Sequence, residues 1–281
     1  MAVLHLKKWN LAIGDRQPLV CIAGLNVLEN LELAMETATH LKAVTARLGM
    51  PFVFKASFDK ANRSSITSYR GPGLAKGLEM LAAVKAKLDV PIATDIHEID
   101  QTGPVAAVAD LVQIPAFLCR QTDLVVAAAR ATAAAGGWLH VKKGQFLAPW
   151  DCRNIVSKIH EAAPGEFTIL CERGNSFGYN NLVVDMLGIS EMKRLGVPVT
   201  IDATHAVQLP GADPRTQGGT TGGRRGGVPI IAKAAVASGA DGVFLEFHPD
   251  PDKALCDGPS CLPLDSAEGL LKSLQAIRAA L

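Results

Sequence analysis

The sequence predicts an α/β fold, a (β/α)8 or TIM barrel, and three observations carry this prediction. Eight short runs rich in β-branched residues alternate strictly with eight Ala- and Leu-rich stretches of helical pattern. Such alternation favours a parallel sheet, and eight repeats favour its closure into a barrel. The strand runs begin almost continuously apolar, which is typical of strands buried on both faces. The length of 281 residues also suits the roughly 250 residues of such a barrel.

The predicted strands are short and are followed by polar or glycine-containing loops. In chain order they are 19–24 (LVCIAG), 51–57 (PFVFKAS), 91–98 (PIATDIHE), 111–116 (LVQIPA), 139–145 (LHVKKGQ), 167–174 (FTILCERG), 197–206 (VPVTIDATHA) and 242–249 (GVFLEFHP). The predicted helices are 30–48, 73–88, 101–108, 122–135, 150–162, 180–194, 227–238 and 265–280. The longest irregular stretch, 207–226, is long enough to be a mobile active-site loop.

A doubly wound open sheet is the structural alternative to the barrel. The G-x-G-x-x-G sequence of its nucleotide-binding form is missing after the first strand, where AGLNVLEN stands instead. No linker or break in composition marks a second domain. We therefore expect residues 1–281 to form a single catalytic barrel domain with a short N-terminal extension.

Composition excludes several classes of partner. Lys and Arg number 28 against 27 Asp and Glu, a net charge of +1, so the chain has no global field for nucleic acid or an anionic membrane. No apolar run approaches the roughly 18 residues of a membrane span, and no apolar segment follows Lys7 and Lys8 to make a signal peptide. The six cysteines include no C-x-x-C pair. We expect a reducing, cytoplasmic location.

Seven of the eight predicted strands begin apolar and end polar. A single polar strand end is more often a rim charge or loop cap than a catalytic group, but a ring of them is harder to explain in that way. The carboxyl ends of the strands form the active-site face of a barrel. The residues concerned are Lys55, Ser57, Asp95, His97, Glu98, Gln113, Lys142, Lys143, Gln145, Glu172, Arg173, Asp202, His205, Glu246, His248 and Asp250.

The cations among these strand ends and the loops after them predict an anionic ligand. Such a cluster in a nearly neutral chain indicates phosphate or carboxylate groups in the pocket. Ser64, Ser65 and the backbone N–H groups of 218–223 offer further donors. The pair Arg224–Arg225 is by itself typical of a solvated loop, but in this setting we favour an anion clamp. The cations are Lys55, Lys60, Arg63, Arg120, Lys142, Arg173, Arg224 and Arg225.

Several segments resemble one family from about residue 18 to the C-terminus, the 3-deoxy-D-manno-octulosonate 8-phosphate synthases. The segments are KASFDKANRSS (55–65), YRGPG (69–73), TDIHE (94–98), QIPAFLCRQTDL (113–124), CERGNSFGYNNLVVDM (171–186), DATH (202–205) and EFHPDPDKALCDGP (246–259). KANRSS is the specific marker, because the heptulosonate 7-phosphate synthases, which are similar in fold, carry Lys-Pro-Arg-Thr there.

This resemblance implies an enzyme that condenses phosphoenolpyruvate with D-arabinose 5-phosphate and water, in the synthesis of the lipopolysaccharide inner core. The residues implied around phosphoenolpyruvate are Lys55, Lys60, Gln113, Lys142, Arg173 and His205. Those implied around arabinose 5-phosphate are Asn62, Arg63, Ser64 and Asp95, with Arg120 reaching its phosphate from a neighbouring subunit of a homotetramer. The predicted catalytic residues are Lys60, Lys142, His205, Asn26 and Asp257.

The resemblance also bears on metal dependence. One branch of the family binds a divalent metal through a Cys on the first strand, together with His, Glu and Asp, which correspond here to His205, Glu246 and Asp257. Asn26 stands at the Cys position. Because an amide is a poor ligand for a thiophilic cation, we hypothesise a vestigial site, with no metal and no other cofactor.

The sequence departs from the family pattern at two places, and it leaves two rival functions open. Gly144 stands where relatives carry Pro, and the stretch 207–226 is longer than in many of them, so the role of Arg224 and Arg225 is undefined. The first rival is another phosphoenolpyruvate-condensing barrel, of the heptulosonate phosphate or sialic acid type. The second is a non-catalytic barrel that binds sugar phosphates without releasing phosphate.

Overall fold

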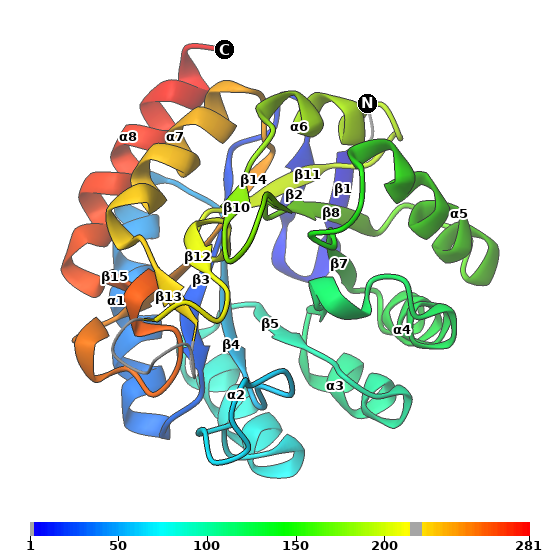
Figure 1. Cartoon of the computed structure of the whole chain (residues 1–281). Helices are drawn as coiled ribbons and strands as arrows, with labels where there is room; N and C mark the ends of the chain where they lie inside the picture. The colour runs from blue at the N-terminus through cyan, green and yellow to red at the C-terminus, as the bar shows by residue number, and fades with distance from the viewer. Residues whose placement is uncertain (1–2, 214–220) are drawn as a thin grey trace.

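Eight parallel strands close into a barrel (Figure 1) in the computed structural model, which describes residues 3–213 and 221–281. The sheet closes because β11 pairs with both β8 and β14. This confirms the predicted (β/α)8 fold. The barrel strands are β3 (Val20–Val27), β4 (Phe52–Ser57), β5 (Ile92–Asp95), β6 (Leu111–Ile114), β7 (Trp138–Lys142), β8 (Thr168–Glu172), β11 (Val199–Asp202) and β14 (Gly242–His248).

Helices follow the strands and surround the barrel (Figure 1). They are α1 (Leu31–Leu48), α2 (Leu74–Leu88), α3 (Thr102–Val108), α4 (Thr122–Ala135), α5 (Arg153–Ala162), α6 (Met186–Lys193), α7 (Val228–Ala237) and α8 (Ala267–Ala279). Each predicted helix is present, but α6 begins later than the predicted 180–194. The chain before it forms the small hairpin β9 (Asn175–Ser176) and β10 (Leu182–Val183), and Asp185 caps α6 by accepting from the N–H of Leu187.

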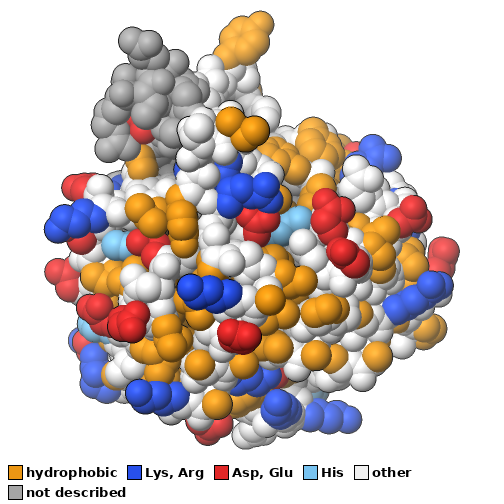
Figure 2. Space-filling model, turned by 90° about the horizontal axis from the view of Figure 1, so that it is seen from below, with side chains coloured by type: hydrophobic (Ala, Val, Ile, Leu, Met, Phe, Trp, Pro, Cys, Tyr) orange, Lys and Arg blue, Asp and Glu red, His pale blue; other side chains and the backbone are white. Residues whose placement is uncertain are grey.

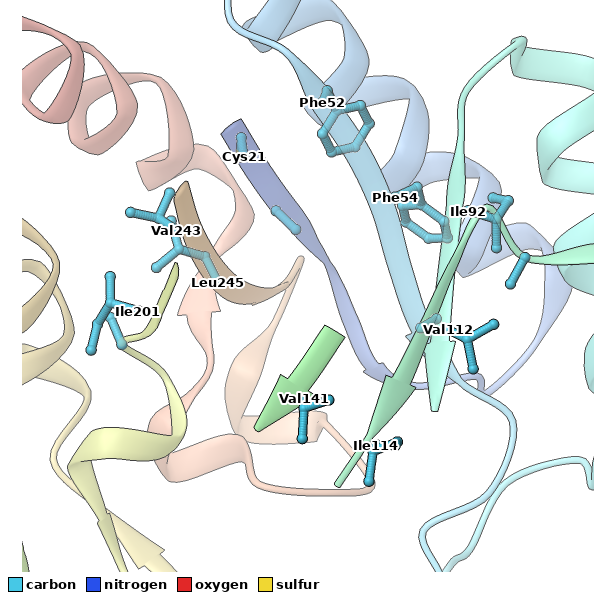
Figure 3. Packing of buried hydrophobic residues seen from close by; sticks show 14 of the residues in the cluster. Cys21, Phe52, Phe54, Ile92, Val112, Ile114, Val141, Ile201, Val243 and Leu245 are labelled. Atoms are coloured by element: carbon cyan, nitrogen blue, oxygen red, sulfur yellow. The ribbon is translucent and has the colours of Figure 1, made fainter. Parts of the chain in front are cut away.

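Alternation along each strand divides the core into two layers. The outward side chains pack against the helices, and Figure 3 shows this layer with Cys21, Phe52, Phe54, Ile92 and Val112. The inward side chains fill the barrel near the starts of the strands. This inner cluster contains Val20, Ile22, Val53, Ala93, Leu111, Trp138, Ile169 and Phe244.

The N-terminal extension is a hairpin that packs on the inner cluster. Its strands are β1 (Val3–Leu6) and β2 (Leu11–Gly14), and Leu4, Leu6 and Ile13 are buried in that cluster. Because these apolar side chains cover the amino ends of the barrel strands, a ligand enters the barrel from the carboxyl ends.

Charged side chains of both signs lie together on one face of the molecule (Figure 2). On the face shown in Figure 2, Lys and Arg are interspersed with Asp and Glu and with hydrophobic side chains, in keeping with the net charge of +1. Among the described residues, no helix is both long and apolar enough to cross a membrane. All six cysteines are buried free thiols.

Candidate active site

A pocket of about 440 Å³ opens at the carboxyl ends of the barrel strands. That volume lies in the range of small-molecule sites, about 300–1,000 Å³. It is lined by all six residues predicted for phosphoenolpyruvate and by four of the five predicted for arabinose 5-phosphate. These are Lys55, Lys60, Gln113, Lys142, Arg173 and His205, and Asn62, Arg63, Ser64 and Asp95. Asp257 also lines the pocket, and Arg120 does not.

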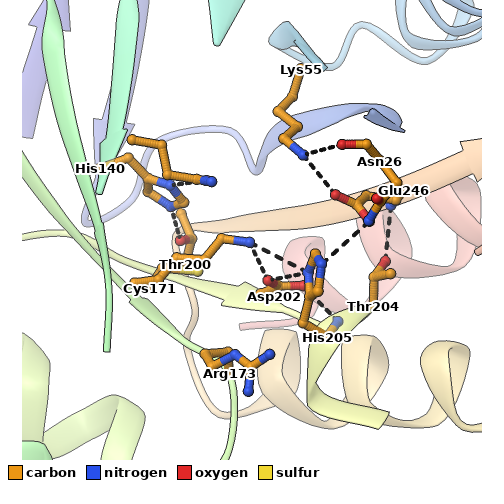
Figure 4. Close-up of polar contacts among 12 residues, drawn as sticks. Asn26, Lys55, His140, Cys171, Arg173, Thr200, Asp202, Thr204, His205 and Glu246 are labelled. Carbon is orange, nitrogen blue, oxygen red and sulfur yellow. Dashed lines mark hydrogen bonds and ion pairs between the residues drawn. The ribbon is translucent and has the colours of Figure 1, made fainter. Parts of the chain in front are cut away.

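One wall is built on a buried ion pair between β4 and β14. The Nζ of Lys55 lies 2.7 Å from Oε1 of Glu246 and donates to the backbone oxygen of Asn26 at 3.1 Å (Figure 4). Both charged side chains are almost fully buried. Burial lowers the pKa of Lys55, and the Glu246 carboxylate opposes this shift. Burial alone raises the pKa of Glu246, but the charges of His205, Lys55 and Lys60 hold it well below its usual range.

Asp202, at the end of β11, organises the opposite wall. Its carboxylate accepts from Lys142 of β7 and contacts Nδ1 of His205 at 2.7 Å, and it also accepts from the backbone N–H of His205 at 2.9 Å. Burial opposes its ionisation, but His205 and Lys142 hold its pKa well below the usual range. With Nδ1 engaged in this way, Nε2 of His205 lies 3.5 Å from Glu246 and 3.7 Å from Asp257.

A buried aromatic ring, Phe244, lies against two lysines of the pocket. The Nζ of Lys142 lies 3.6 Å from the centroid of Phe244, and the Nζ of Lys55 lies 5.2 Å from it. An aromatic face attracts a cation without neutralising it. The ring therefore adds to the ion pairs, Lys55 with Glu246 and Lys142 with Asp202, that hold these two lysines at the pocket.

Beneath Gln113 lies a buried histidine that the sequence prediction did not single out. The Nδ1 of His140 is 3.1 Å from Oε1 of Gln113, and its Nε2 is 2.8 Å from Oγ1 of Thr200. Burial, followed by the charge of Lys142, lowers the pKa of His140 to about 3. The ring is therefore neutral at physiological pH, and donation from Nδ1 to Gln113 would leave the Gln113 NH₂ group free for a ligand.

The other end of the pocket is formed by the loop after β4 and by Asp95. The Nη1 of Arg63 lies 2.6 Å from Sγ of Cys256 and 3.9 Å from Asp257. Asp95 contacts Nε2 of His97 at 3.2 Å, while its buried Oδ1 has no partner among the described residues. Burial raises the pKa of Asp95, but His97, Lys60 and Lys55 hold it well below the usual range.

Lys60 differs from the other pocket lysines. Lys60 is buried, with 9% of its surface exposed. Even so, no hydrogen bond or ion pair joins its Nζ to another residue in the described part of the chain. Burial disfavours its charge, but the carboxylates of Glu246 and Asp95 outweigh burial and raise its pKa. Lys60 is therefore a permanent cation with free donors that faces the pocket.

Arg224 and Arg225 do not form the anion clamp that the sequence favoured. Arg224 donates to the backbone oxygen of Leu182, and Arg225 donates to Asp252 and to the backbone oxygen of Gly258. Neither arginine lines the pocket. Of the predicted stretch 207–226, residues 214–220 lie outside the described residues, and so do three of the N–H groups expected at 218–223.

Gly144 has a local explanation. A Cβ atom at this position would lie 2.7 Å from the ring of Phe146. The absence of a side chain therefore lets that ring fold over the backbone beside Lys142 and Lys143. With Gly at position 144, Lys142 lines the pocket.

The sequence also left some site residues without a role. Asp202 was recognised only as a polar strand end, and Glu246 also as a member of a vestigial metal set, but their pairing with Lys142 and Lys55 was not predicted. His140 and Gln208 carried no signal beyond a polar residue near a strand, and both contact predicted substrate-binding residues.

Comparisons with known proteins agree with this geometry. The sequence model described as the DAHP synthetase I family matches residues 2–281. Three curated relatives carry the name 2-dehydro-3-deoxyphosphooctonate aldolase. The relative from Geobacter metallireducens is 55% identical over 270 residues, which is 96% of each chain. That from Nitratidesulfovibrio vulgaris is 57% identical over 256 residues, 91% of this chain and 90% of its own. The relative from Shewanella denitrificans is 53% identical over 265 residues, which is 94% of this chain and 90% of its own. The chain therefore belongs to the DAHP synthetase I family.

Proposed function

We propose that this protein is a 3-deoxy-8-phosphooctulonate synthase, a transferase that condenses phosphoenolpyruvate with D-arabinose 5-phosphate and water. The products are 3-deoxy-D-manno-octulosonate 8-phosphate and inorganic phosphate, in lipopolysaccharide inner-core synthesis. The observation that carries the proposal is a strand-end pocket with cations at both ends, in a chain more than half identical over nearly its full length to relatives named for this chemistry. Two anionic substrates require such a pocket.

The cations at the base of the pocket suit phosphoenolpyruvate. This substrate carries a carboxylate and a phosphate, and Lys55, Lys142 and Arg173 hold them. When C3 attacks the aldehyde carbon of the sugar, a C–C bond forms and positive charge develops at C2. The aldehyde oxygen takes up a proton and becomes a hydroxyl group, while water adds at C2 and loses a proton. The resulting tetrahedral intermediate expels phosphate by C–O cleavage, and its C2 hydroxyl loses a proton to give the ketone. Fixed donors on Lys60 and His205 stabilise the aldehyde oxygen and the departing phosphate.

The same pocket avoids a strong base that would attack phosphoenolpyruvate before the sugar arrives. Asp202, Glu246 and Asp95 line or underlie it, and each has its pKa held well below the usual range by neighbouring cations. A carboxylate of low pKa is a weak proton acceptor. These groups therefore position cations and leave proton transfer to His205 and water.

Arabinose 5-phosphate fits the opposite end of the pocket. Asn62, Arg63 and Ser64 lie together in the loop after β4 and provide donors for a phosphate or for hydroxyl groups. The unpartnered Oδ1 of Asp95 offers an acceptor to a sugar hydroxyl. This arrangement puts the aldehyde between the two groups of cations.

Release of inorganic phosphate from phosphoenolpyruvate tests the function directly. We expect release with arabinose 5-phosphate and at least about 100-fold less with erythrose 4-phosphate, because a site built to pair a substrate's hydroxyl groups rejects an analogue that leaves its own buried groups unpaired. Preference for erythrose 4-phosphate would favour the heptulosonate phosphate type. Tight binding of both substrates without phosphate release would favour the non-catalytic barrel.

We propose further that catalysis proceeds without a metal, and Asn26 supports this. Its Nδ2 lies 2.5 Å from Oε2 of Glu246 and 3.3 Å from Oδ2 of Asp257. The amide NH₂ thus points at the two carboxylates that would have to face a cation in the metal-dependent branch, with His205 beside them. An NH₂ group is a hydrogen-bond donor and no metal ligand, so these four side chains do not fit a metal centre.

Chelation and a single substitution test this proposal. Exhaustive chelation is expected to leave the wild-type turnover number unchanged, and collapse of activity that Zn²⁺ or Mn²⁺ restores would contradict the proposal.

Asn26→Cys is expected to create a metal site, since a thiolate completes the set with His205, Glu246 and Asp257. Metal content per chain is measured on the purified variant and on Asn26→Ser, a control without a thiol. Equal metal content in both variants would argue against a thiolate site.

The assembly is proposed to be a homotetramer in the cytoplasm. Arg120 is exposed and outside the pocket, as expected if it serves the pocket of a neighbouring subunit. Large apolar side chains are also exposed, namely Phe117, which lies close to Arg120 in sequence, and Phe146 and Trp150. Exposed apolar groups of this kind favour subunit contact, and six free thiols suit a reducing compartment. The mass of the protein in solution measures the oligomeric state.

A further inference from the structure

Gln208 connects two residues of the pocket through the two ends of one amide group. Its Oε1 accepts from Nη2 of Arg173 at 2.8 Å, and its Nε2 donates to Oδ2 of Asp257 at 3.0 Å. The side chain is 9% exposed and lines the pocket. We propose that Gln208 is a positioning residue that orients Arg173 toward an anionic group of phosphoenolpyruvate without neutralising its charge. This inference rests on the proposed function.

Arg173 is a buried cation with free binding capacity. No carboxylate lies within ion-pair distance of its guanidinium among the described residues, and its buried Nη1 has no hydrogen-bond partner there. The side chain is 5% exposed. Burying a charge without a counter-charge is costly, so the arrangement indicates that a bound anion completes it.

The carboxylates near Arg173 are each engaged by other groups. Asp202 binds Lys142 and His205. Glu172 accepts from the backbone N–H groups of Arg173 and Gly174, at 2.9 and 2.6 Å. The remaining carboxylate, Asp257, is separated from Arg173 by Gln208. The amide therefore occupies the position from which a counter-ion would neutralise the guanidinium.

The chemistry of an amide suits this position better than any charged group. It is neutral, and it presents an acceptor to the cation and a donor to the carboxylate at the same time. A carboxylate at position 208 would pair with Arg173 and repel Asp257. A cation at position 208 would pair with Asp257 and repel Arg173. Because both contacts are satisfied, the orientation of the Gln208 amide is defined by its two neighbours.

The backbone of Gln208 is held by a short hairpin. Strand β12 (Gln208–Leu209) pairs with β13 (Gly222–Gly223), and Gln208 is opposite Gly223. A Cβ atom on Gly223 would lie 2.1 Å from Oγ of Ser260 and 2.8 Å from the backbone of Pro259. The hairpin therefore packs closely on the loop that carries Asp257. This packing keeps the amide between Arg173 and Asp257.

Two substitutions separate the positioning role from simple packing. Gln208→Glu keeps the size but adds the charge that would neutralise Arg173. Gln208→Met keeps the approximate volume but removes both hydrogen bonds. Gln17→Glu adds the same charge before β3, at the amino end of the barrel, and serves as the control. Each variant is measured for kcat, for the KM of both substrates, and for the Kd of inorganic phosphate by calorimetry.

We expect Gln208→Glu to raise the KM for phosphoenolpyruvate and the Kd for phosphate by about 10- to 100-fold, the equivalent of one charge-assisted hydrogen bond. The KM for arabinose 5-phosphate is expected to change by a factor of about two or less, within the weak effect of a more distant charge. Gln208→Met is expected to raise the KM for phosphoenolpyruvate by a smaller factor, and Gln17→Glu to match the wild type.

Two outcomes would overturn the inference. One is a wild-type KM for phosphoenolpyruvate in Gln208→Glu. The other is an equal loss for both substrates in Gln208→Glu and Gln208→Met, which would indicate a packing role alone. Failure of the proposed function is distinct from both, because the wild-type protein itself would then release no phosphate in the presence of arabinose 5-phosphate. The phosphate-binding measurement requires no turnover, so it tests Gln208 in that case as well.

Discussion

Replacing Lys60 with Met is expected to lower kcat/KM by about 100- to 1,000-fold, the cost of removing one fixed donor from a developing charge. The Nζ of Lys60 has no hydrogen bond or ion pair within the described residues, yet neighbouring carboxylates raise its pKa and keep it charged. Its removal therefore takes away a ligand for the substrate and leaves no hydrogen-bond partner unpaired. Because the nearby carboxylates favour the charged lysine in the folded state, the free energy of unfolding is expected to fall as well.

Steady-state kinetics and urea unfolding measure the two effects of Lys60→Met separately. Lys76→Met, on the exposed face of α2, is the matched control, because it removes the same charge away from the pocket. Near wild-type kcat/KM in Lys60→Met would remove this lysine from the catalytic set. A loss of stability together with an unchanged kcat/KM would show that Lys60 supports the fold and not the reaction.

Replacing Glu246 with Leu is expected to lower the free energy of unfolding by about 3–5 kcal/mol, the usual cost of breaking one side of a buried ion pair. Lys55, which lies 2.7 Å from Glu246 and is 1% exposed, would keep a buried charge without its partner. Asn26 would also lose its shortest side-chain contact. The loss arises chiefly from the stranded charge, because the volume at position 246 is largely retained.

A double-mutant cycle tests that explanation. Lys55→Met combined with Glu246→Leu removes both charges, so the double variant is expected to recover most of the stability lost in Glu246→Leu. Urea unfolding of the four proteins gives the coupling energy between the two positions. Strictly additive losses would show that Lys55 and Glu246 contribute independently. Activity is expected to be lost in all three variants, so stability is the informative measurement.

The sequence predicted the barrel well for a physical reason. Each barrel strand is buried on both faces, as β3 is throughout Val20–Val27, and such strands leave an apolar run that can be recognised locally. Of the hairpin β9–β10, only β10 fell within a predicted helix, 180–194. Its strands have two residues each and stand among polar residues, so neither a helical nor a strand period can develop.

The residues of the pocket were predictable for a related reason. In a parallel barrel every strand ends at the same face, so polar strand ends converge whatever their separation in the chain. Lys55, Lys142 and Arg173 were placed together on that basis, and the structure brings them to one pocket. Arg224 and Arg225 lie in a loop, where no such rule applies, and they bind protein groups outside the pocket.

The sequence by itself determined the order of strands and helices, the face that carries the site and the anionic character of the ligand, because these follow from local patterns and barrel geometry. Only the tertiary structure decided which charges are neutralised and which are free. Lys55 pairs with Glu246, 191 residues away, and Gln208 reaches Arg173 and Asp257 across the barrel mouth. Such pairings join segments far apart in the chain. They form only where strand register and side-chain rotamers place the two groups correctly to within about an ångström. For that reason Lys60 and Arg173 emerge as free cations only in three dimensions.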